Sequence, residues 1–582
     1  MSCEEIASFL AMTVNGAFME NKTFDAIVVG SGISGGWAAK ELCELGVKTL
    51  VLERGRNIEH LKDYPTATKN PWDFPHRMQE PKAVLDENPV ISKCYAFGED
   101  TQHFFVKDKE HPYIQEKPFD WIRGYQVGGK SITWGRACQR WSNFEFSAPQ
   151  RYGYAVDWPI RYEDIAPWYS HVEKFAGICG GKDGLEALPD GEYLEPFEMS
   201  AVEQEIQKKI SAHYQDRFMV RTRWAHLTKP EPIHLEQGRG QCQARDLCTR
   251  GCPFGGYFSS VSSTLPWAKK TGNLTIRPHS VVHSIIYDEQ KGKAVGVKII
   301  DALTNQEVDY YAKVIFLNAA CLNTNLILLN SKSHRFPNGL GNDNGLLGKF
   351  MAFQNYRASV YGTYDGLKDA YYYGRNPTNP IIANYRNLHK QDTDYLGGFL
   401  TFVFSNRSPE FRNDRNQGIG GNYKDSLTEP GPWRAGMFMQ GETIPKESNH
   451  VRLSTDQKDP WGIPQLITSV GYDENDDKMV ADFLTQSAEM LEVAGLRDIV
   501  KNDTHQAPGL DIHEMGGCRM GHDPKTSLLN KFNQLHLCQN VFVTDGACMT
   551  STGNQSPSIL YMAFAARAAH HAVEEMKKGN LS

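Results

Sequence analysis

A strand, a glycine-rich turn, a helix and a second strand follow one another near the start of the chain. Residues 25–29 read as a fully buried parallel strand, and residues 30–35 have the form GxGxxG. We expect a helix over 34–45 and a second strand over 48–53. A βαβ unit of this kind builds a parallel sheet whose first turn binds the pyrophosphate of a dinucleotide.

Each residue of this turn has a physical reason to be there. Gly30 permits the tight turn, Gly32 lets the backbone approach the pyrophosphate, and Gly35 allows the helix to pack closely on the strand. The helix N-terminus at Ser34 presents free N–H groups and a positive dipole end to the phosphates. Glu53, at the end of the second strand, can accept hydrogen bonds from ribose hydroxyls.

The turn alone does not distinguish FAD from NAD. The unit lies at the very start of the chain, and Glu53 is followed by Arg54 and a glycine, a pattern typical of FAD folds. We therefore predict FAD as the dinucleotide.

Length and charge limit the remaining possibilities. A chain of 582 residues exceeds what one core supports, so we expect at least two domains. The net charge of −7 gives no indication of a nucleic-acid binder. No stretch reaches the ~18 apolar residues that span a bilayer, and the N-terminus lacks the features of an export signal. We expect no transmembrane segment, and expect any export to depend on a signal-bearing partner.

Hydrophobic patterns predict further elements along the chain. Residues 4–19 place apolar side chains on one helical face, either for packing on their own domain or for docking a partner. Alternating aromatic runs indicate an antiparallel sheet. Further strands are expected at 274–277, 281–287, 294–300, 313–317, 395–405, 434–440 and 541–544, and helices at 476–496 and from 558 onward.

The order of these patterns predicts interleaved domains. We expect a mixed α/β and α+β fold, in which a Rossmann-like FAD-binding domain alternates along the chain with an antiparallel-sheet substrate domain. The predicted segments are an N-terminal helix (1–23), FAD-binding parts (24–160, 226–345 and 506–582) and substrate parts (161–225 and 346–505).

Several motifs spread over the chain carry a family resemblance. They are the βαβ unit, GYQVGGKSITWG at 124–135, DWPI with a tyrosine-rich stretch at 157–169, NAA at 318–320, HEMGGCRMG at 513–521, and DG at 545–546 with NQSP at 554–557. In this ordered set the chain resembles the glucose–methanol–choline (GMC) oxidoreductases, with a pyranose-oxidase-like architecture.

The resemblance implies cofactor contacts position by position. Near the pyrophosphate and flavin it implies Gly128, Gly129, Ser131 and Trp134; near the adenine, Val282 and Ala319; at the ribityl or pyrophosphate portion, Asp545 and Gly546. The helix after Pro557 is expected to point its N-terminus at the flavin. Pyranose oxidase carries a histidine bonded to flavin where this chain has Thr133, so we predict non-covalent FAD.

The resemblance also implies a catalytic pair. His513 is the expected base for the hydroxyl proton, and flavin N5 is the expected hydride acceptor. Relatives often place an asparagine directly before the proline, where this chain has Ser556. We assign the second role to Asn554, whose amide can both donate to and accept from a hydroxyl, with its neighbours as alternatives.

Three of the twelve cysteines are clustered, at Cys242, Cys248 and Cys252. Thiolates at this spacing can surround one soft metal centre, and three of them suit a [3Fe–4S] cluster. The alternatives are zinc with a fourth ligand such as His234, or a disulfide with one free thiol. Bacterial FAD glucose dehydrogenases of the family have a similar triplet that holds such a cluster, which favours the first interpretation.

Within the family the chain is most similar to bacterial sugar dehydrogenases of the glucoside 3-dehydrogenase type, on the motifs at 131–141 and 561–567. This implies oxidation of the C3 hydroxyl of a glucoside or disaccharide to a ketone. Electrons would leave through the cluster to a cytochrome c. A small subunit would carry the export signal to the periplasm, with a cytoplasmic location as the alternative.

Other functions stay open at this point. They are a sugar oxidase that uses O₂, and a gluconate, fructose or polyol dehydrogenase. A flavoprotein that only relays electrons is disfavoured, because a relay needs no base at His513.

Overall fold

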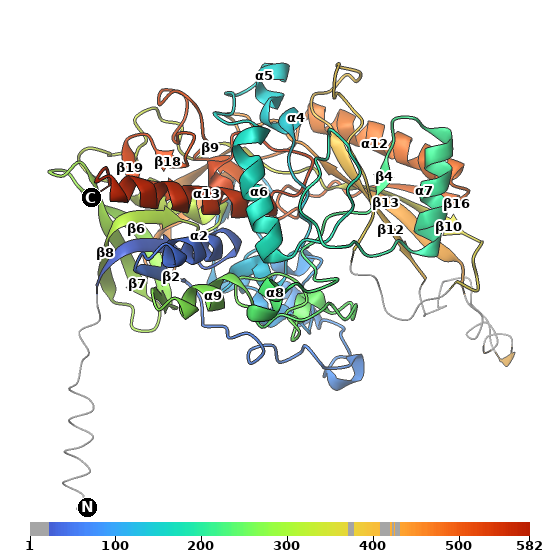
Figure 1. Ribbon diagram of the computed structural model, residues 1–582, viewed down its shortest axis with the longest axis horizontal. Coiled ribbons are helices and arrows are strands. Elements are labelled where there is room, and N and C mark those ends of the chain that lie inside the picture. The colour runs from blue at the N-terminus through green and yellow to red at the C-terminus, as the bar shows by residue number, and fades with distance from the viewer. Residues whose placement is uncertain (1–21, 371–377, 408–419, 422–423, 425–430, 582) are drawn as a thin grey trace, which may run out of the picture.

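The computed structural model describes residues 22–370, 378–407, 420, 421, 424 and 431–581 (Figure 1). The predicted helix over 4–19 lies outside the described residues. Among the described residues the strands form three sheets. Figure 1 shows the first sheet and the second sheet toward opposite ends of the long axis of the molecule.

The first sheet contains the predicted dinucleotide-binding unit. Strand β1 (Thr23–Val29) pairs in parallel with β2 (Thr49–Leu52) and with β8 (Glu307–Leu317), and helix α2 (Ile33–Glu44) joins the first two. Its other strands are β5 (Leu274–Arg277), β6 (Ser280–Asp288), β7 (Lys293–Asp301), β18 (Gln534–Leu535) and β19 (Cys538–Val543). The predicted parallel unit is confirmed within a mixed sheet, because β6, β7 and β18 pair antiparallel with their neighbours.

Helices bury this sheet because its strands are apolar on both faces. Helix α2 packs against α13 (Ser558–Lys577) and α9 (Thr264–Lys270), and α13 packs against α6 (Tyr162–Ala176). Figure 1 shows α2, α13 and α6 together on one side of the first sheet. Helix α10 (Cys321–Asn330) follows β8 directly.

The second sheet is antiparallel, as the aromatic runs predicted. Helices α7 (Ala201–His213) and α12 (Glu474–Val493) supply side chains such as Ile206 and Phe483 to its core. In spatial order its strands are β16 (Arg497–Asp503), β10 (Ala358–Tyr364), β13 (Trp433–Gly441), β12 (Phe399–Asn406), β11 (Ile381–Ile382) and β4 (Met219–Val220).

A third sheet corrects the predicted segment boundaries. It contains β17 (Met515–Gly517), β9 (Lys349–Ala352), β14 (His450–Lys458), β15 (Pro464–Ser469) and β3 (Ile114–Gln115). Val451 and Leu466 of this sheet, and Ile165 and Val172 of α6, belong to the core of the first domain. The segments 161–225 and 346–505 are therefore divided between the two cores, because the apolar face of α6 finds its partner in α13.

Residues 54–161 run over the first domain as loops and short helices. The helical pieces are Pro71–Asp73, α3 (Lys82–Glu87), Ile91–Lys93, Gln102–Phe104, Asp108–Glu110, Gly129–Ile132, α4 (Asn143–Phe146) and α5 (Ala148–Tyr152). Further short helices are α8 (Pro232–Glu236), Cys248–Arg250 and Gly546–Cys548.

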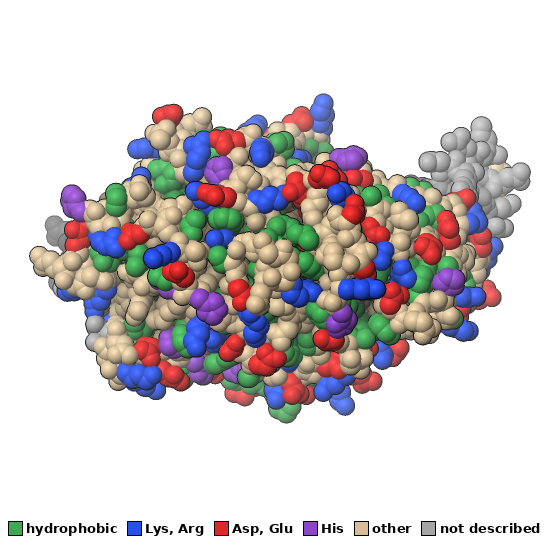
Figure 2. Space-filling view, turned by 90° about the horizontal axis from the view of Figure 1, so that it is seen from above, with side chains coloured by type: hydrophobic (Ala, Val, Ile, Leu, Met, Phe, Trp, Pro, Cys, Tyr) green, Lys and Arg blue, Asp and Glu red, His purple; other side chains and the backbone are tan. Residues whose placement is uncertain are grey.

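The face drawn in Figure 2 carries charges of both signs. Figure 2 shows Lys and Arg side chains interspersed with Asp and Glu over the whole face drawn. Within the described part of the chain, no helix has the length and apolar character needed to cross a bilayer.

Candidate active site

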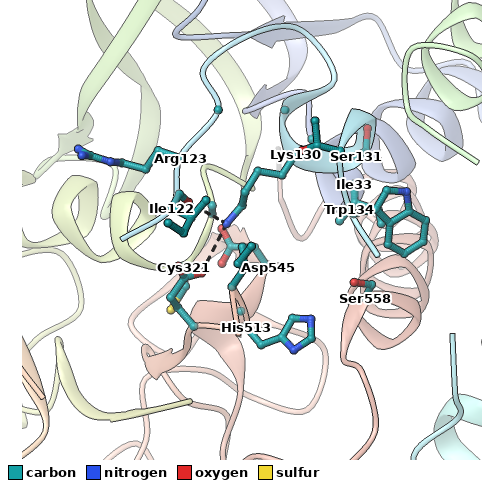
Figure 3. A pocket seen from close by; sticks show the side chains of 18 of the residues that line it. Ile33, Ile122, Arg123, Lys130, Ser131, Trp134, Cys321, His513, Asp545 and Ser558 are labelled. Atoms are coloured by element: carbon teal, nitrogen blue, oxygen red, sulfur yellow. Dashed lines mark hydrogen bonds and ion pairs between the residues drawn. The ribbon is translucent and has the colours of Figure 1, made fainter. Parts of the chain in front are cut away.

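A cavity of about 620 Å³ extends from the glycine-rich turn to the second sheet. Gly30, Gly32 and Glu53 line one part of it, and Phe402 and Phe438 of β12 and β13 line another. In Figure 3 the Lys130 side chain points into this cavity, with His513 and Ser558 below it. Chain segments from both cores thus face one space.

The glycines of the turn have no room for side chains. Gly30 has φ +94°, and a Cβ there would lie 2.3 Å from the Asn318 carbonyl oxygen. A Cβ on Gly35 would lie 2.0 Å from the Gly30 carbonyl oxygen. A Cβ on Gly32 would meet nothing within 4 Å, because Gly32 faces the open cavity. Gly30 and Gly35 thus allow neighbouring backbone segments to approach closely, and Gly32 leaves space for a bound group.

Glu53 ties the turn together from inside. Its Oε2 accepts hydrogen bonds from the Ser31 amide at 3.1 Å and from Ser31 Oγ at 2.5 Å, and its Oε1 accepts from the Gly55 amide at 3.0 Å. The Gly128 amide donates to Ser31 Oγ at 2.9 Å, which joins the turn to the motif at 124–135. Burial raises the pKa of Glu53.

The structure brings the predicted cofactor residues to the cavity. Gly35 and Gly128 lie behind the wall; Gly128 has φ +89°. The residues that line the cavity are Gly30, Gly32, Ser34, Glu53, Arg54, Gly129, Ser131, Trp134, Val282, Ala319, Asp545 and Gly546, together with Thr133.

Helix N-termini supply positive potential to this space. The first residues of α2, α10 and α13, which are Ile33, Cys321 and Ser558, all line the cavity. Such ends attract negative charge. Asp545 accepts from Thr324 Oγ1 at 2.5 Å and from the Ala547 amide, and burial raises its pKa to about 6. The glycine cradle and the helix ends fit the diphosphate of FAD.

His513 lies in the cavity wall with one ring nitrogen engaged. Its Nδ1 lies 2.6 Å from Gln354 Oε1, which can only accept, so Nδ1 carries the hydrogen and Nε2 keeps a free lone pair. Burial, followed by Lys130, lowers the pKa of His513 to about 3. The imidazole is therefore neutral at ordinary pH and is able to accept a proton.

Gln354 connects His513 to the loop before α13. Its Nε2 donates to the carbonyl oxygens of Gly553 at 2.5 Å and Gln555 at 2.9 Å, and its backbone amide donates to Asp511. Sequence analysis missed Gln354, because it lies 159 residues from His513 in a region with no motif.

Asn554 does not line the cavity, although we assigned it the second catalytic role. Its side chain is fully buried and donates to Glu442 Oε1 at 2.8 Å and to Glu145 Oε1 at 3.3 Å. Ser556 and Gln440 line the cavity instead. The correction has a simple cause: the chain turns between 554 and 556, so the amide points away from the site toward two carboxyl groups.

The wall on the side of the second sheet is aromatic. Phe402 and Phe438 stack with ring centroids 4.8 Å apart, and Tyr356 meets Phe438 edge-on at 5.3 Å. Trp224 and Tyr95 also line the cavity. These residues come from distant segments of the chain, and no short sequence motif predicted that they line the cavity.

The three clustered cysteines are free thiols on a loop at the edge of the cavity, which Cys248 lines. Burial, together with the nearby Cys248 and Cys252, raises the pKa of Cys242 to about 11. No group of three ligands around one metal ion is found among the described residues. Both ring nitrogens of His234 bond to the backbone, which argues against zinc with His234.

Comparison with known proteins agrees with this geometry. The chain is 26% identical to paromamine 6'-oxidase of Streptomyces fradiae over 94% of this chain and 91% of that protein. It is 24% identical to the fructose dehydrogenase large subunit of Gluconobacter japonicus, over 96% of this chain and all of that one. The crystal structure of pyridoxine 4-oxidase from Mesorbium loti shares the fold, with a TM-score of 0.56 and 14% identity over 94% of this chain and 99% of that chain.

Sequence profiles of one family match most of the chain. Residues 24–343 and 445–565 both match profiles described as GMC oxidoreductase. The first match contains the glycine turn and the cysteine loop, and the second contains His513 and Asn554. The protein therefore belongs to the GMC oxidoreductase family and is an FAD-dependent enzyme that acts on CH–OH donors.

Proposed function

We propose that this enzyme is a dehydrogenase that oxidises a secondary hydroxyl of a sugar to a ketone. The observation that carries the proposal is the neutral imidazole of His513, held by Gln354 with its Nε2 lone pair free, in the wall of the FAD cavity. Alcohol oxidation needs a base of this kind for the hydroxyl proton.

Different residues of this chain would accept the hydroxyl proton and orient the substrate. His513 takes the hydroxyl proton at Nε2, and Gln354 keeps its ring in the productive tautomer. Ser556 and Gln440 orient the substrate oxygen from the neighbouring wall. FAD, when bound, supplies the acceptor for the hydride. We propose that FAD is bound non-covalently, since Thr133 offers no imidazole for a flavin bond.

A sugar fits the chemistry of the remaining wall. Aromatic rings such as Phe438 and Trp224 offer flat apolar faces, while the side chains of Asn379, Gln440 and Ser556 are neutral and polar. We propose the C3 hydroxyl of a glucoside or disaccharide as the target. The name of one relative, fructose dehydrogenase large subunit, supports a sugar.

The test is a substrate screen with an artificial electron acceptor. Glucose, trehalose, lactose and cellobiose are offered, and NMR of the product locates the new ketone. A 3-keto product supports the proposal in full. Oxidation at another carbon overturns the assignment of C3, and turnover of simple alcohols alone overturns the sugar assignment.

For the electron route we propose a [3Fe–4S] cluster held by the thiolates of Cys242, Cys248 and Cys252, whose chemistry is one-electron transfer. The free thiols and the place of Cys248 in the cavity wall support it. Among the described residues the three thiols are not arranged as ligands of one metal ion, so each iron of the cluster would take one thiolate. The proposal extends to a cytochrome c acceptor and a small subunit that directs the pair to the periplasm.

Iron and acid-labile sulfide analysis of anaerobically purified protein tests the cluster. We expect both elements in the wild type and their loss in C248S, with FAD retained. A protein without iron or sulfide that still has full dye-linked activity contradicts this route.

A second candidate is an oxidase that passes electrons to O₂, which the similarity to paromamine 6'-oxidase favours. Oxygen consumption at the rate of substrate oxidation, without added acceptor, would replace the dehydrogenase proposal by this one.

A further inference from the structure

Two buried glutamates lie behind the loop that carries Ser556, and one amide joins them. Glu145 is 2% exposed and Glu442 is 5% exposed. Asn554 Nδ2 donates to Glu442 Oε1 at 2.8 Å and to Glu145 Oε1 at 3.3 Å. Within the described part of the chain, neither carboxyl group forms a salt bridge. Two carboxylates this close and this deeply buried are not both ionised at neutral pH.

The surrounding groups do not neutralise the pair. Tyr152 and Tyr154 lie near Glu442, Tyr169 lies near Glu145, and Arg151 is the cation that acts on Glu442. The Arg151 guanidinium, however, donates to the main-chain oxygens of Phe144, Asn387 and Leu388 and to the Tyr152 hydroxyl, and not to either carboxyl group.

The two carboxyl groups differ in the hydrogen bonds they accept. Glu145 Oε2 accepts from the backbone amide and the hydroxyl of Ser142, both at 2.7 Å. Glu442 accepts from the Asn554 side chain and from the Gly398 backbone amide. Since donors stabilise the charged form, the negative charge belongs on Glu145 and the proton on Glu442.

We propose that Glu442 and Glu145 are positioning residues that share one proton, and that this proton keeps Gln440 and Ser556 in place in the substrate cavity. The proposal deepens the proposed function, because alcohol oxidation is the activity these residues would serve. Neither glutamate lines the cavity, so both act through other residues.

The link to the cavity is short. Gln440 lies two residues before Glu442, and its Nε2 donates to the Asn554 carbonyl oxygen at 2.9 Å and to Ser556 Oγ at 3.3 Å. Asn554 thus bonds to the glutamates through its side chain and to a cavity residue through its backbone. A shift of Asn554 moves Gln440 and Ser556 with it.

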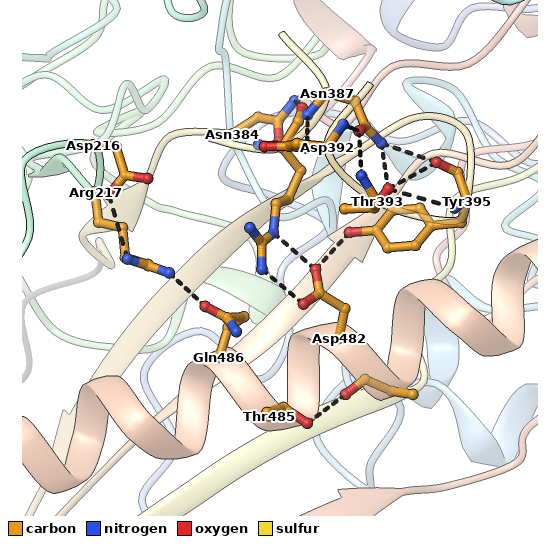
Figure 4. A network of polar contacts seen from close by, with 12 residues as sticks. Asp216, Arg217, Asn384, Asn387, Asp392, Thr393, Tyr395, Asp482, Thr485 and Gln486 are labelled. Carbon is orange, nitrogen blue, oxygen red and sulfur yellow. Dashed lines mark hydrogen bonds and ion pairs between the residues drawn. The ribbon is translucent and has the colours of Figure 1, made fainter. Parts of the chain in front are cut away.

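Glu442 packs closely against the backbone at Gly397 and Gly398. A Cβ on Gly397 would lie 2.9 Å from Glu442 Oε2, and the Glu442 amide donates to the Gly398 carbonyl oxygen. Figure 4 shows Tyr395, from the loop before Gly397, donating a hydrogen bond to Asp482 of α12. Asp482 also accepts two hydrogen bonds from Arg386. Repulsion between two ionised glutamates would therefore act on the Asn554 bridge.

The pH at which this happens follows from the environment. Burial, followed by repulsion from Glu145, raises the pKa of Glu442 to about 8. The proton is present below this pH and is lost as the pH rises through it. Gln440 and Ser556 are therefore displaced from their positions in the cavity on the alkaline side.

The experiment compares E442Q, E145Q and the control D476N by kcat from about pH 6 to about pH 10 and by infrared spectroscopy of protonated carboxyl groups. Asp476 is a second buried carboxyl of raised pKa, at the start of α12 and away from the cavity. Wild type and D476N should lose about tenfold in kcat per pH unit above about pH 8. E442Q should keep the neutral rate within about threefold and lack this loss.

The infrared spectrum tests the pair without any substrate. We expect a protonated carboxyl band at pH 7 that E442Q removes and that titrates at lower pH in E145Q, since the repelling charge is gone. An unchanged alkaline loss in E442Q, or no band that depends on Glu442, overturns the inference. If wild type oxidises no alcohol but shows the band, the proposed function fails and the proton pair stands.

Discussion

Replacement of Gln354 by leucine tests how much of catalysis depends on the orientation of His513. Leucine has a volume and shape similar to those of glutamine, but the substitution removes three hydrogen bonds. One is donated by His513 Nδ1, and two are donated to the carbonyl oxygens of Gly553 and Gln555. Each contributes ~0.5–1.5 kcal/mol net, so the loss is about 3 kcal/mol. If it falls on the transition state, kcat/KM decreases about 100-fold at ~1.36 kcal/mol per decade.

The assay is dye-linked sugar oxidation at saturating acceptor, with bound flavin measured by absorbance. Q465L is the matched control, because Gln465 is also buried and donates to one main-chain oxygen, that of Lys458, away from the site. Q354E adds a second readout: a carboxylate beside Nδ1–H raises the pKa of His513, so activity decreases at a higher pH on the acid side. A folded, flavin-loaded Q354L with wild-type kcat/KM refutes the reasoning.

Four further predictions follow from the same structure. H513A should lose at least about 1000-fold in kcat while FAD stays bound; comparable turnover at equal flavin content would remove the base from His513. Wild-type kcat should show no acid-side loss from His513 until the pH approaches its pKa of about 3, which a pH profile of kcat checks. G32A should fold with an unchanged apoenzyme melting temperature but bind FAD at least about 100-fold more weakly, because its Cβ enters the cavity. G35A should instead lower the melting temperature, because its Cβ clashes with the Gly30 carbonyl oxygen. The contributions of Asp545 and Asp511 to apoenzyme stability should decrease as the pH rises from about 4 to about 8, because burial raises their folded-state pKa values to about 6 and about 7, and the folded state therefore holds protons that the unfolded chain releases. The melting temperature of D545N/D511N apoenzyme relative to wild type should therefore increase with pH over this range, and a constant difference would contradict the prediction.

Local patterns were sufficient for the dinucleotide-binding unit and for several of the longer strands and helices. The strand β5 has the predicted bounds, and α2, β13 and α12 differ from prediction by one to three residues at an end. Each has a strong period or a clear stop signal within its own stretch. The third sheet was not predicted, because three of its strands have four residues or fewer and because its pairings join distant segments, such as Ile114 with Ile467. No local period records such a pairing.

The site divides in the same way. The glycine turn could be identified because its geometry is set by neighbours in the chain, and His513 could be identified because it begins a motif that carries the family resemblance. Gln354 could not, because its role arises from contacts with His513 and Gln555, which lie 159 and 201 residues away. Glutamines with such long-range partners look like any other glutamine in the sequence.

The choice between Asn554 and Ser556 shows a different limit. Sequence chemistry favours Asn554, since an amide both donates and accepts and a serine is the weaker candidate. The structure uses that amide behind the wall, where it bridges Glu145 and Glu442, and leaves Ser556 beside Gln440 in the cavity. Two buried carboxyl groups need a donor more than a water-accessible cavity does, because the cost of an unpaired acceptor is greatest where no water can reach it. Asn554 is thus suited both to bind a substrate hydroxyl and to bridge the buried carboxyl groups. The direction of its side chain decides which of these roles it takes, and the local sequence does not encode that direction.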